Sequence, residues 1–180
     1  QMQKSMEKSM KKAVIYESGT GFTKQYAQWI SEELHCDCVN RKKISKKEML
    51  NYDKIIYGGW IFGGQIMGLK EIREVISPFA VFAVGCSPSN FEEVVNQIKI
   101  MNSVGLENQT PFFYFEGGLH FKQLGFFKKF ILKAIKKVVN QKIEKTRQEE
   151  FMAKNLATDF DNSDRTQIKD LVDFCKNNLE

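Results

Sequence analysis

The chain has 180 residues, of which 42% are hydrophobic, and a formal net charge of +5. This length suits one domain with a full hydrophobic core, and no apolar run approaches the roughly 20 residues of a membrane span. The four cysteines include no Cys-x-x-Cys pair, so a zinc or iron–sulfur site and a disulfide framework are both unexpected. We therefore expect no metal, and we also expect no nucleic-acid partner.

The N-terminus differs in composition from the rest of the chain. Residues 1–9 are polar and rich in lysine and methionine, and they lack the apolar centre of a signal peptide. Met10, followed by two lysines and an apolar run, has the pattern of a natural start. We expect residues 1–9 to be an extension or an artificial remnant, residues 10–180 to form one domain, and the protein to be cytoplasmic.

The loop after the first predicted strand (12–17) has the composition of a phosphate-binding loop. It combines hydroxyl side chains, which can donate to a phosphate, with glycines that let the backbone approach closely. These residues are Ser18, Thr20, Thr23, Gly19 and Gly21. A helix predicted over 22–34 comes directly after it, and its free N–H groups and dipole favour an anion at the same point.

Three kinds of phosphate loop are known to follow a strand in this way. A Walker loop needs Gly-x-x-x-x-Gly-Lys-Ser/Thr, which this stretch lacks. A dinucleotide loop needs Gly-x-Gly-x-x-Gly and an acidic residue about 20 positions later. Here Lys24 stands at the third glycine position, and the second predicted strand (37–41) ends without a carboxylate.

The third pattern, Ser/Thr-x-Thr-Gly-x-Thr, matches residues 18–23 at every fixed position. This stretch resembles the FMN phosphate loop of the flavodoxin family. The resemblance implies that FMN is the cofactor and that its phosphate is held by the hydroxyls of Ser18, Thr20 and Thr23 with the amides of Gly19, Gly21 and Phe22. The alternative is a tight turn without a ligand, in which Thr20 or Gly21 caps the helix.

The rest of the chain alternates between strand and helix patterns. Further strands are predicted at 37–41, 52–59, 79–84 and 111–115. Helices are predicted at 45–50, 69–77, 91–101 and 125–139 and after a cap at 162–164, whereas 60–68 and 85–90 are predicted loops and 140–162 is irregular or partly helical. This alternation predicts a three-layer α/β fold, doubly wound and flavodoxin-like, with a five-stranded parallel sheet in the order 2-1-3-4-5.

In this strand order a ligand lies at the carboxyl ends of strands one and three. A flat flavin ring needs an apolar face to stack on, and the loop after strand three offers Trp60, Ile61 and Phe62 on a glycine frame. By resemblance to the family, Trp60 stacks on the ring, a backbone group in the stretch 58–59 lies beside it, and the loop after strand four closes the other edge. The remaining candidates are therefore Gly58, Gly59, Gly63, Ser87, Pro88, Ser89 and Asn90. The alternative for Trp60 is a core tryptophan that covers the sheet edge.

The helix predicted at 125–139 is strongly amphipathic, with apolar residues at helical spacing on one face and five lysines on the other. We expect its apolar face to pack on the sheet. The alternative is a weak contact between the basic helix 126–139 and an anionic membrane surface. Of the two histidines, His35 is expected to cap its helix or to be solvated, and His120 is a candidate for contact with flavin or substrate.

The family resemblance implies an FMN-binding protein that acts in electron transfer, with a redox protein or a quinone-like acceptor as its partner. The chain also resembles the sub-group that includes the menaquinone-dependent protoporphyrinogen dehydrogenases, in residues 18–24, in the aromatic second loop and from Phe115 through the basic helix, although its loop after strand four is shorter. A flavin-dependent dehydrogenase and a flavin-free interaction module on the same fold therefore remain alternatives. The oligomeric state stays open.

Overall fold

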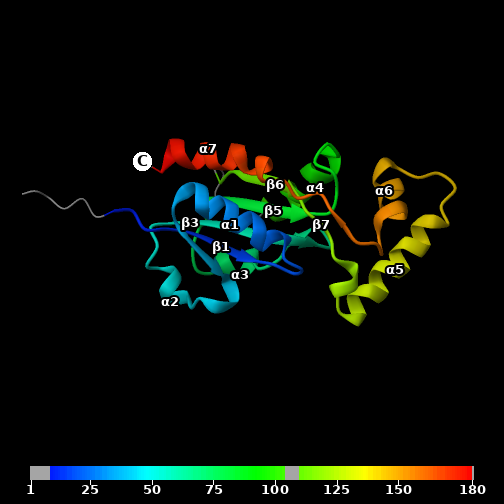
Figure 1. The fold of residues 1–180 in the computed structure, drawn as a ribbon, viewed down its shortest axis with the longest axis horizontal. Helices are drawn as coiled ribbons and strands as arrows, with labels where there is room; N and C mark the ends of the chain where they lie inside the picture. The colour runs from blue at the N-terminus through cyan, green and yellow to red at the C-terminus, as the bar shows by residue number, and fades with distance from the viewer. Residues whose placement is uncertain (1–8, 104–109, 180) are drawn as a thin grey trace, which may run out of the picture.

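A computed structural model describes residues 9–103 and 110–179, and its fold is shown in Figure 1. The strands of the main parallel sheet are β1 (Lys12–Glu17), β2 (Asp37–Asn40), β3 (Lys54–Phe62), β5 (Ala80–Gly85) and β6 (Phe112–Glu116). The short strands are β4 (Gln65–Ile66), β7 (Gly118–Leu119) and β8 (Phe160–Asp161). The α-helices are α1 (Phe22–Leu34), α2 (Lys46–Met49), α3 (Leu69–Arg73), α4 (Glu92–Ser103), α5 (Phe126–Asn140), α6 (Arg147–Asn155) and α7 (Lys169–Asn178). Residues 1–8 of the expected N-terminal extension lie outside the described residues.

The main sheet has the order β2-β1-β3-β5-β6, and all of these neighbours pair in parallel. This confirms the predicted five-stranded, flavodoxin-like order. Register brings the carboxyl ends of β1 and β3 together, because Tyr16 pairs with Gly58 and Glu17 with Gly59. The strand order reverses between β1 and β3, so the loops that follow them diverge and leave room for a ligand.

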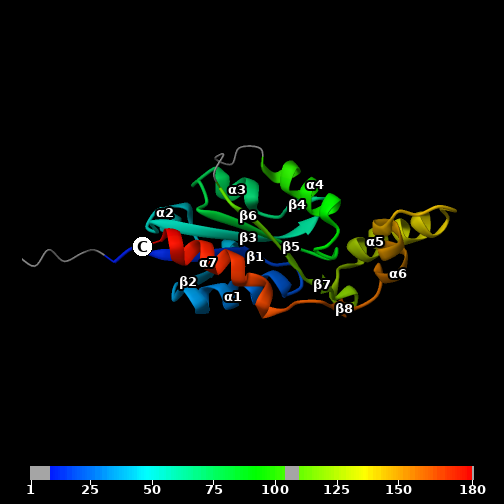
Figure 2. The same ribbon diagram turned by 90° about the horizontal axis from the view of Figure 1, so that it is seen from above.

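Helices cover both faces of this sheet, as Figure 2 shows. Successive residues of β1 point to opposite faces: Val14 and Tyr16 join the core beneath α1 and α7. Ala13 and Ile15 join a second core, to which α2, α3 and α4 contribute. Because both faces of every central strand are buried, the strands read as nearly continuous apolar runs.

The segment 60–68, which we predict as a loop, is a β-hairpin instead. β3 continues through Trp60 to Phe62, and β4 pairs back on it in antiparallel fashion. Gly63 and Gly64 connect the two strands with φ angles of 58° and 79°. Two consecutive glycines at positive φ form the type of turn whose twist matches a two-residue hairpin. Gly63 and Gly64, which led us to predict a loop, therefore form the turn of the hairpin.

The second departure lies between β6 and α7. β7 and β8 pair in antiparallel fashion and close the base of a long excursion, residues 120–159, that contains α5 and α6. Figure 2 shows both helices beyond the carboxyl ends of the sheet strands. Of the polar segment predicted as irregular or partly helical, residues 147–155 are helical.

The prediction that the apolar face of the basic helix packs on the sheet is wrong. The side chains of Phe126, Phe127 and Phe130 are 88%, 73% and 64% exposed. Both faces of the sheet are already covered by other helices, so no sheet surface remains for α5. In the described part of the chain, no helix is long and apolar enough to cross a membrane.

Candidate functional site

The site begins in the turn between β1 and α1. Gly21 adopts a φ of 109°, which favours glycine, and Ser18 Oγ accepts a hydrogen bond of 3.0 Å from its amide. Among the described residues, no side chain caps the start of α1, and its first turn contains no acidic residue. The positive end of the α1 dipole therefore faces the turn, and no acidic side chain of the first helical turn offsets it.

Thr23 is the most informative residue of this turn. Its side chain is 1% exposed, yet its hydroxyl oxygen has no hydrogen-bond partner in the described structure. A buried hydroxyl without a partner costs about 1–3 kcal/mol. Because Thr23 also lines a pocket beside the turn, a phosphate oxygen at this point would restore the missing hydrogen bond. The residues present thus fit a phosphate monoester.

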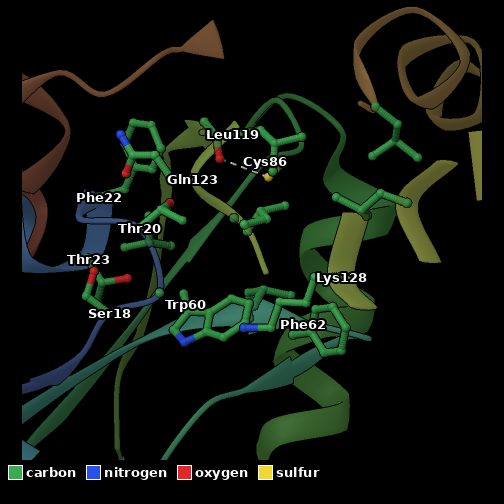
Figure 3. A pocket seen from close by; sticks show the side chains of 18 of the residues that line it. Ser18, Thr20, Phe22, Thr23, Trp60, Phe62, Cys86, Leu119, Gln123 and Lys128 are labelled. Atoms are coloured by element: carbon green, nitrogen blue, oxygen red, sulfur yellow. Dashed lines mark hydrogen bonds between the residues drawn. The ribbon is translucent and has the colours of Figure 1, made fainter. Parts of the chain in front are cut away.

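This pocket is a cavity of about 220 Å³ and is shown in Figure 3. One side is formed by the turn and the β3–β4 hairpin, a second by the end of β5, and a third by the excursion. Its lining comprises Ser18, Gly19, Thr20, Phe22, Thr23, Trp60, Ile61, Phe62, Val84, Gly85, Cys86, Gly118, Leu119, Gln123, Leu124, Gly125, Lys128, Leu132 and Leu156. Hydroxyls at one end and apolar side chains over the rest match a ligand with one anionic end and one flat, apolar part.

Trp60 connects the turn to the excursion. A Cβ atom on Gly19 would lie 3.2 Å from the Trp60 ring, so a side chain there would require the indole to move by a few tenths of an ångström. On the other side, the Nζ atom of Lys128 lies 4.4 Å from the centre of the Trp60 ring, and Phe62 packs at a ring distance of 5.6 Å. Trp60 is half-buried in the pocket wall (Figure 3), which favours the pocket role over that of a core tryptophan.

Several candidate residues do not line this pocket. Gly58 and Gly59 lie inside β3, where a Cβ on Gly58 would overlap the ring of Phe82. Their lack of side chains is thus explained by close packing within the sheet. Gly63 lies in the hairpin turn, and Gly21, Ser87, Pro88, Ser89 and Asn90 are also outside the lining.

The loop after β5 is instead held by the protein itself. Ser87 Oγ accepts a hydrogen bond from Gln148 of α6, and its carbonyl accepts one from the Tyr114 hydroxyl at 2.7 Å. The Ser89 amide donates to the Glu116 carboxylate. From this loop and the end of β5, the structure places Val84, Gly85 and Cys86 at the pocket.

Sequence reasoning missed the wall that the excursion supplies. Its residues are Gln123, Leu124, Gly125, Lys128, Leu132 and Leu156, and Leu119 of β7 adjoins them at the base of the excursion. The sequence does carry one signal for this wall: the stretch between the last predicted strand and the last predicted helix is much longer than an ordinary connection of about 2–6 residues. Such long connections are commonly functional.

Cys86 lies where the excursion joins the sheet. Its Sγ atom donates to the Gly118 carbonyl oxygen at 3.1 Å (dashed in Figure 3). Burial raises the pKa of this thiol to about 11, so near neutral pH it is a protonated donor rather than a thiolate. Its part in the site is to tie the end of β5 to β7.

The two histidines take different positions. His120 stacks on Phe22 with ring centroids 4.4 Å apart and an interplanar angle of 13°, which fixes the excursion's base against the start of α1. His35 is exposed at the C-cap of α1 in a left-handed conformation, with φ 49°. This position matches the capping or solvated role expected for it.

A buried carboxylate lies at the end of β1, directly before the turn in sequence. Glu17, the last residue of β1, is largely buried and accepts a hydrogen bond of 2.6 Å from Arg41 Nε. Lys42 Nζ lies 3.5 Å from its other oxygen. The two cations offset the charge of Glu17, so the carboxylate does not oppose an anion at the neighbouring turn.

Comparison with known proteins identifies the family of the chain. A model of the flavodoxin domain matches residues 13–165, and the chain therefore belongs to the flavodoxin family. Among solved structures, it is similar to flavodoxin 2 from Bacillus cereus, with 22% identity and a TM-score of 0.44 over 59% of this chain and 84% of that one. It is also similar to the Trp repressor binding protein from Bacillus subtilis, with 17% identity and a TM-score of 0.42 over 59% and 85%. No curated protein sequence matches the chain significantly. Family membership supports a flavin-binding, redox function in general terms.

Proposed function

We propose that the protein binds FMN in this pocket and acts as an electron-transfer protein. The phosphate would lie at residues 18–23 and the ring system against Trp60 in the apolar part of the pocket. The single observation that carries this proposal is the buried, unpartnered hydroxyl of Thr23 at the start of α1. Bound FMN would supply one- or two-electron transfer, which the side chains of the chain do not themselves provide.

The residues around the pocket would bind and orient the flavin. Neutral hydroxyls and amides suit a phosphate at a helix N-terminus, with no lysine required. Trp60, Leu124 and Leu132 line the pocket and would exclude water from the ring, and the Lys128 ammonium group places a positive charge at the pocket wall. The partner would be a redox protein or a quinone-like acceptor, and the four free thiols fit a cytoplasmic setting.

A flavin-dependent dehydrogenase, of the kind that includes the menaquinone-dependent protoporphyrinogen enzymes, is the second candidate. The observation that favours it is the leucine-rich wall contributed by Leu119, Leu124, Leu132 and Leu156. Such a wall suits an apolar substrate beside a flavin better than a carrier that only exposes a ring edge to a protein partner.

The visible absorption spectrum, recorded with and without added FMN and then during stepwise reduction, tests the proposal. We expect a yellow protein. Reduction in two one-electron stages supports the carrier, whereas direct two-electron reduction followed by reoxidation by a quinone favours the dehydrogenase. A colourless protein that takes up no FMN would contradict both and favour the interaction module.

Two substitutions at Thr20 test the phosphate site itself. Thr20→Asp should abolish FMN binding, because it places a carboxylate against the phosphate, while the matched Thr20→Asn variant, which adds no charge, should retain part of it. Fluorescence titration of FMN measures both. Retention of bound FMN by Thr20→Asp would overturn the phosphate-loop assignment.

A further inference from the structure

Helix α5 presents an apolar stripe to solvent. At 100° per residue, Phe126, Phe127, Phe130, Ala134 and Val138 fall within about 120° of the helix circumference. All five are exposed, including Val138 at 60%. On the opposite side, Val139 is buried and Leu132 is half-buried in the pocket wall. The helix thus has an inner side toward the pocket and an outer side that is apolar except for Lys137.

The charge of the chain is concentrated in the same segment. Residues 121–147 contain nine of the chain's 27 Lys and Arg residues but one of its 22 Asp and Glu residues, a formal charge of +8 that leaves −3 for all other residues. Among the described residues, none of the five α5 lysines forms a salt bridge; the ion pairs of this segment are Lys122–Asp159 and Lys142–Glu149. The positive charge is therefore largely uncompensated.

An apolar stripe with phenylalanines and lysines beside it is the pattern of a helix that lies in the plane of a membrane interface. We propose that α5 docks the protein on an anionic lipid surface, with Phe126, Phe127 and Phe130 entering the interface and Lys133 and Lys137 contacting the headgroups. This inference does not depend on flavin binding.

The charge and the exposed phenylalanines of α5 favour a lipid surface over a second copy of the chain or an acidic protein. A second copy of the chain would bring two segments of charge +8 together, which like-charge repulsion opposes. An acidic protein would pair with the lysines but would need its own apolar groove for three exposed phenylalanines. An anionic bilayer offers both negative headgroups for the lysines and an apolar region for the phenylalanines.

Docking would also bring the proposed flavin site to the lipid surface. Lys128 and Leu132 of the same helix line the pocket, and a helix with its side chains is about 10–12 Å thick. The pocket would then lie about one helix diameter from the headgroups.

Vesicle co-sedimentation tests the docking with the full chain. We expect binding to vesicles of 70% phosphatidylcholine and 30% phosphatidylglycerol to exceed binding to pure phosphatidylcholine by about tenfold or more, and to fall several-fold between about 50 and 500 mM NaCl. Equal partition to both vesicle types would overturn the proposal.

Two pairs of matched variants separate the contributions. Phe126→Ser/Phe130→Ser should reduce anionic-vesicle binding about tenfold, while Leu50→Ser/Ile100→Ser, at sites of similar exposure (64% and 71%), should leave it unchanged. Lys133→Gln/Lys137→Gln should weaken binding, whereas Lys46→Gln/Lys47→Gln, with the same change of charge on α2 at the other end of the molecule, should not (Figure 1).

Three results would contradict a lipid partner. If the phenylalanine variant binds vesicles as wild type does, the contact is electrostatic only and the apolar stripe has another role. If sedimentation velocity shows a dimer that this variant abolishes, the stripe is an interface between copies. Binding to an acidic polypeptide as tight as to anionic vesicles would assign the surface to a protein.

FMN titration of each variant shows separately whether the pocket is intact, so that failure of docking and failure of flavin binding are distinguishable.

Discussion

Helices α1 and α5 have similar length and a similar alternation of apolar and polar residues, yet α1 buries its apolar side and α5 leaves most of its apolar side exposed. In α1 the apolar side chains Phe22, Tyr26, Ile30 and Leu34 are all buried against the sheet. In α5 three phenylalanines are mainly exposed, and of its residues only Val139 is buried. Periodicity thus identifies a helix with an apolar side, but not the surface that covers that side.

The difference follows from chain connectivity. α1 connects two adjacent parallel strands, so the crossover must lay it on the sheet. α5 starts after the last strand, inside an excursion closed by β7 and β8, and no further strand of the main sheet calls for a crossover there. The place beside α1 on the sheet is taken by α7, the helix that follows the excursion.

The prediction with the largest expected effect compares a phenylalanine in the sheet core with a phenylalanine on α5. Phe82→Ala removes a ring that is 0% exposed in the sheet core and should cost about 3–5 kcal/mol of unfolding free energy. Phe126→Ala removes a ring that is 88% exposed and should change it by at most about 0.5 kcal/mol. Urea denaturation measures both. A cost above about 2 kcal/mol for Phe126→Ala would show that α5 packs against the protein in solution.

A second test concerns the junction of the two regions at the proposed phosphate site. Thr23→Val keeps the shape of the side chain but removes the unpartnered buried hydroxyl. The flavin-free protein should be unchanged or up to about 1 kcal/mol more stable, while FMN affinity should fall about tenfold, equivalent to about 1.4 kcal/mol.

Ser31→Ala is a suitable control for Thr23→Val, because Ser31 is also a buried hydroxyl residue of α1 but bonds to the Gln28 carbonyl at 2.9 Å. It should leave FMN affinity unchanged. If Thr23→Val destabilised the flavin-free protein by more than about 1 kcal/mol, the hydroxyl would have a partner within the protein and the phosphate argument would lose its basis.

The sheet and the turn between β1 and α1 could be predicted from sequence because they depend on local rules. Apolar strand runs, the Ser18–Thr23 motif and the helix start all lie within a few neighbouring residues, and the strand order follows from crossover handedness. The hairpin was missed because Gly63 and Gly64 form its turn, where their positive φ angles are favourable.

The third wall of the pocket could not be predicted because it depends on a contact between distant segments. Leu124, Lys128 and Leu132 lie more than 60 residues after Trp60, and their approach depends on where β7 and β8 close the excursion. β7 and β8 have two residues each, too few to show an alternating pattern. Gly58 and Gly59 were assigned to the flavin by resemblance to the family. Glycine in a strand also suits close sheet packing, and sequence alone does not separate these two uses.

The smallest expected effect comes from Lys128 of α5, which contacts Trp60 of the main sheet. Its ammonium group lies 4.4 Å from the centre of the Trp60 ring, a contact expected to stabilise by about 0.5–1 kcal/mol. Because a positive charge at the pocket favours the more negative, reduced flavin, Lys128→Met should lower the midpoint potential of bound FMN by roughly 20–40 mV, about 1–2 kcal/mol for a transferred pair of electrons. Lys133→Met makes the same change of charge further along the same helix, at an exposed position outside the pocket lining, and should shift the potential by less than about 10 mV. Equal shifts in the two variants, measured by dye-equilibrated redox titration, would mean that the excursion acts through its overall charge; a shift confined to Lys128→Met would show that α5 contributes to the flavin site as a specific wall.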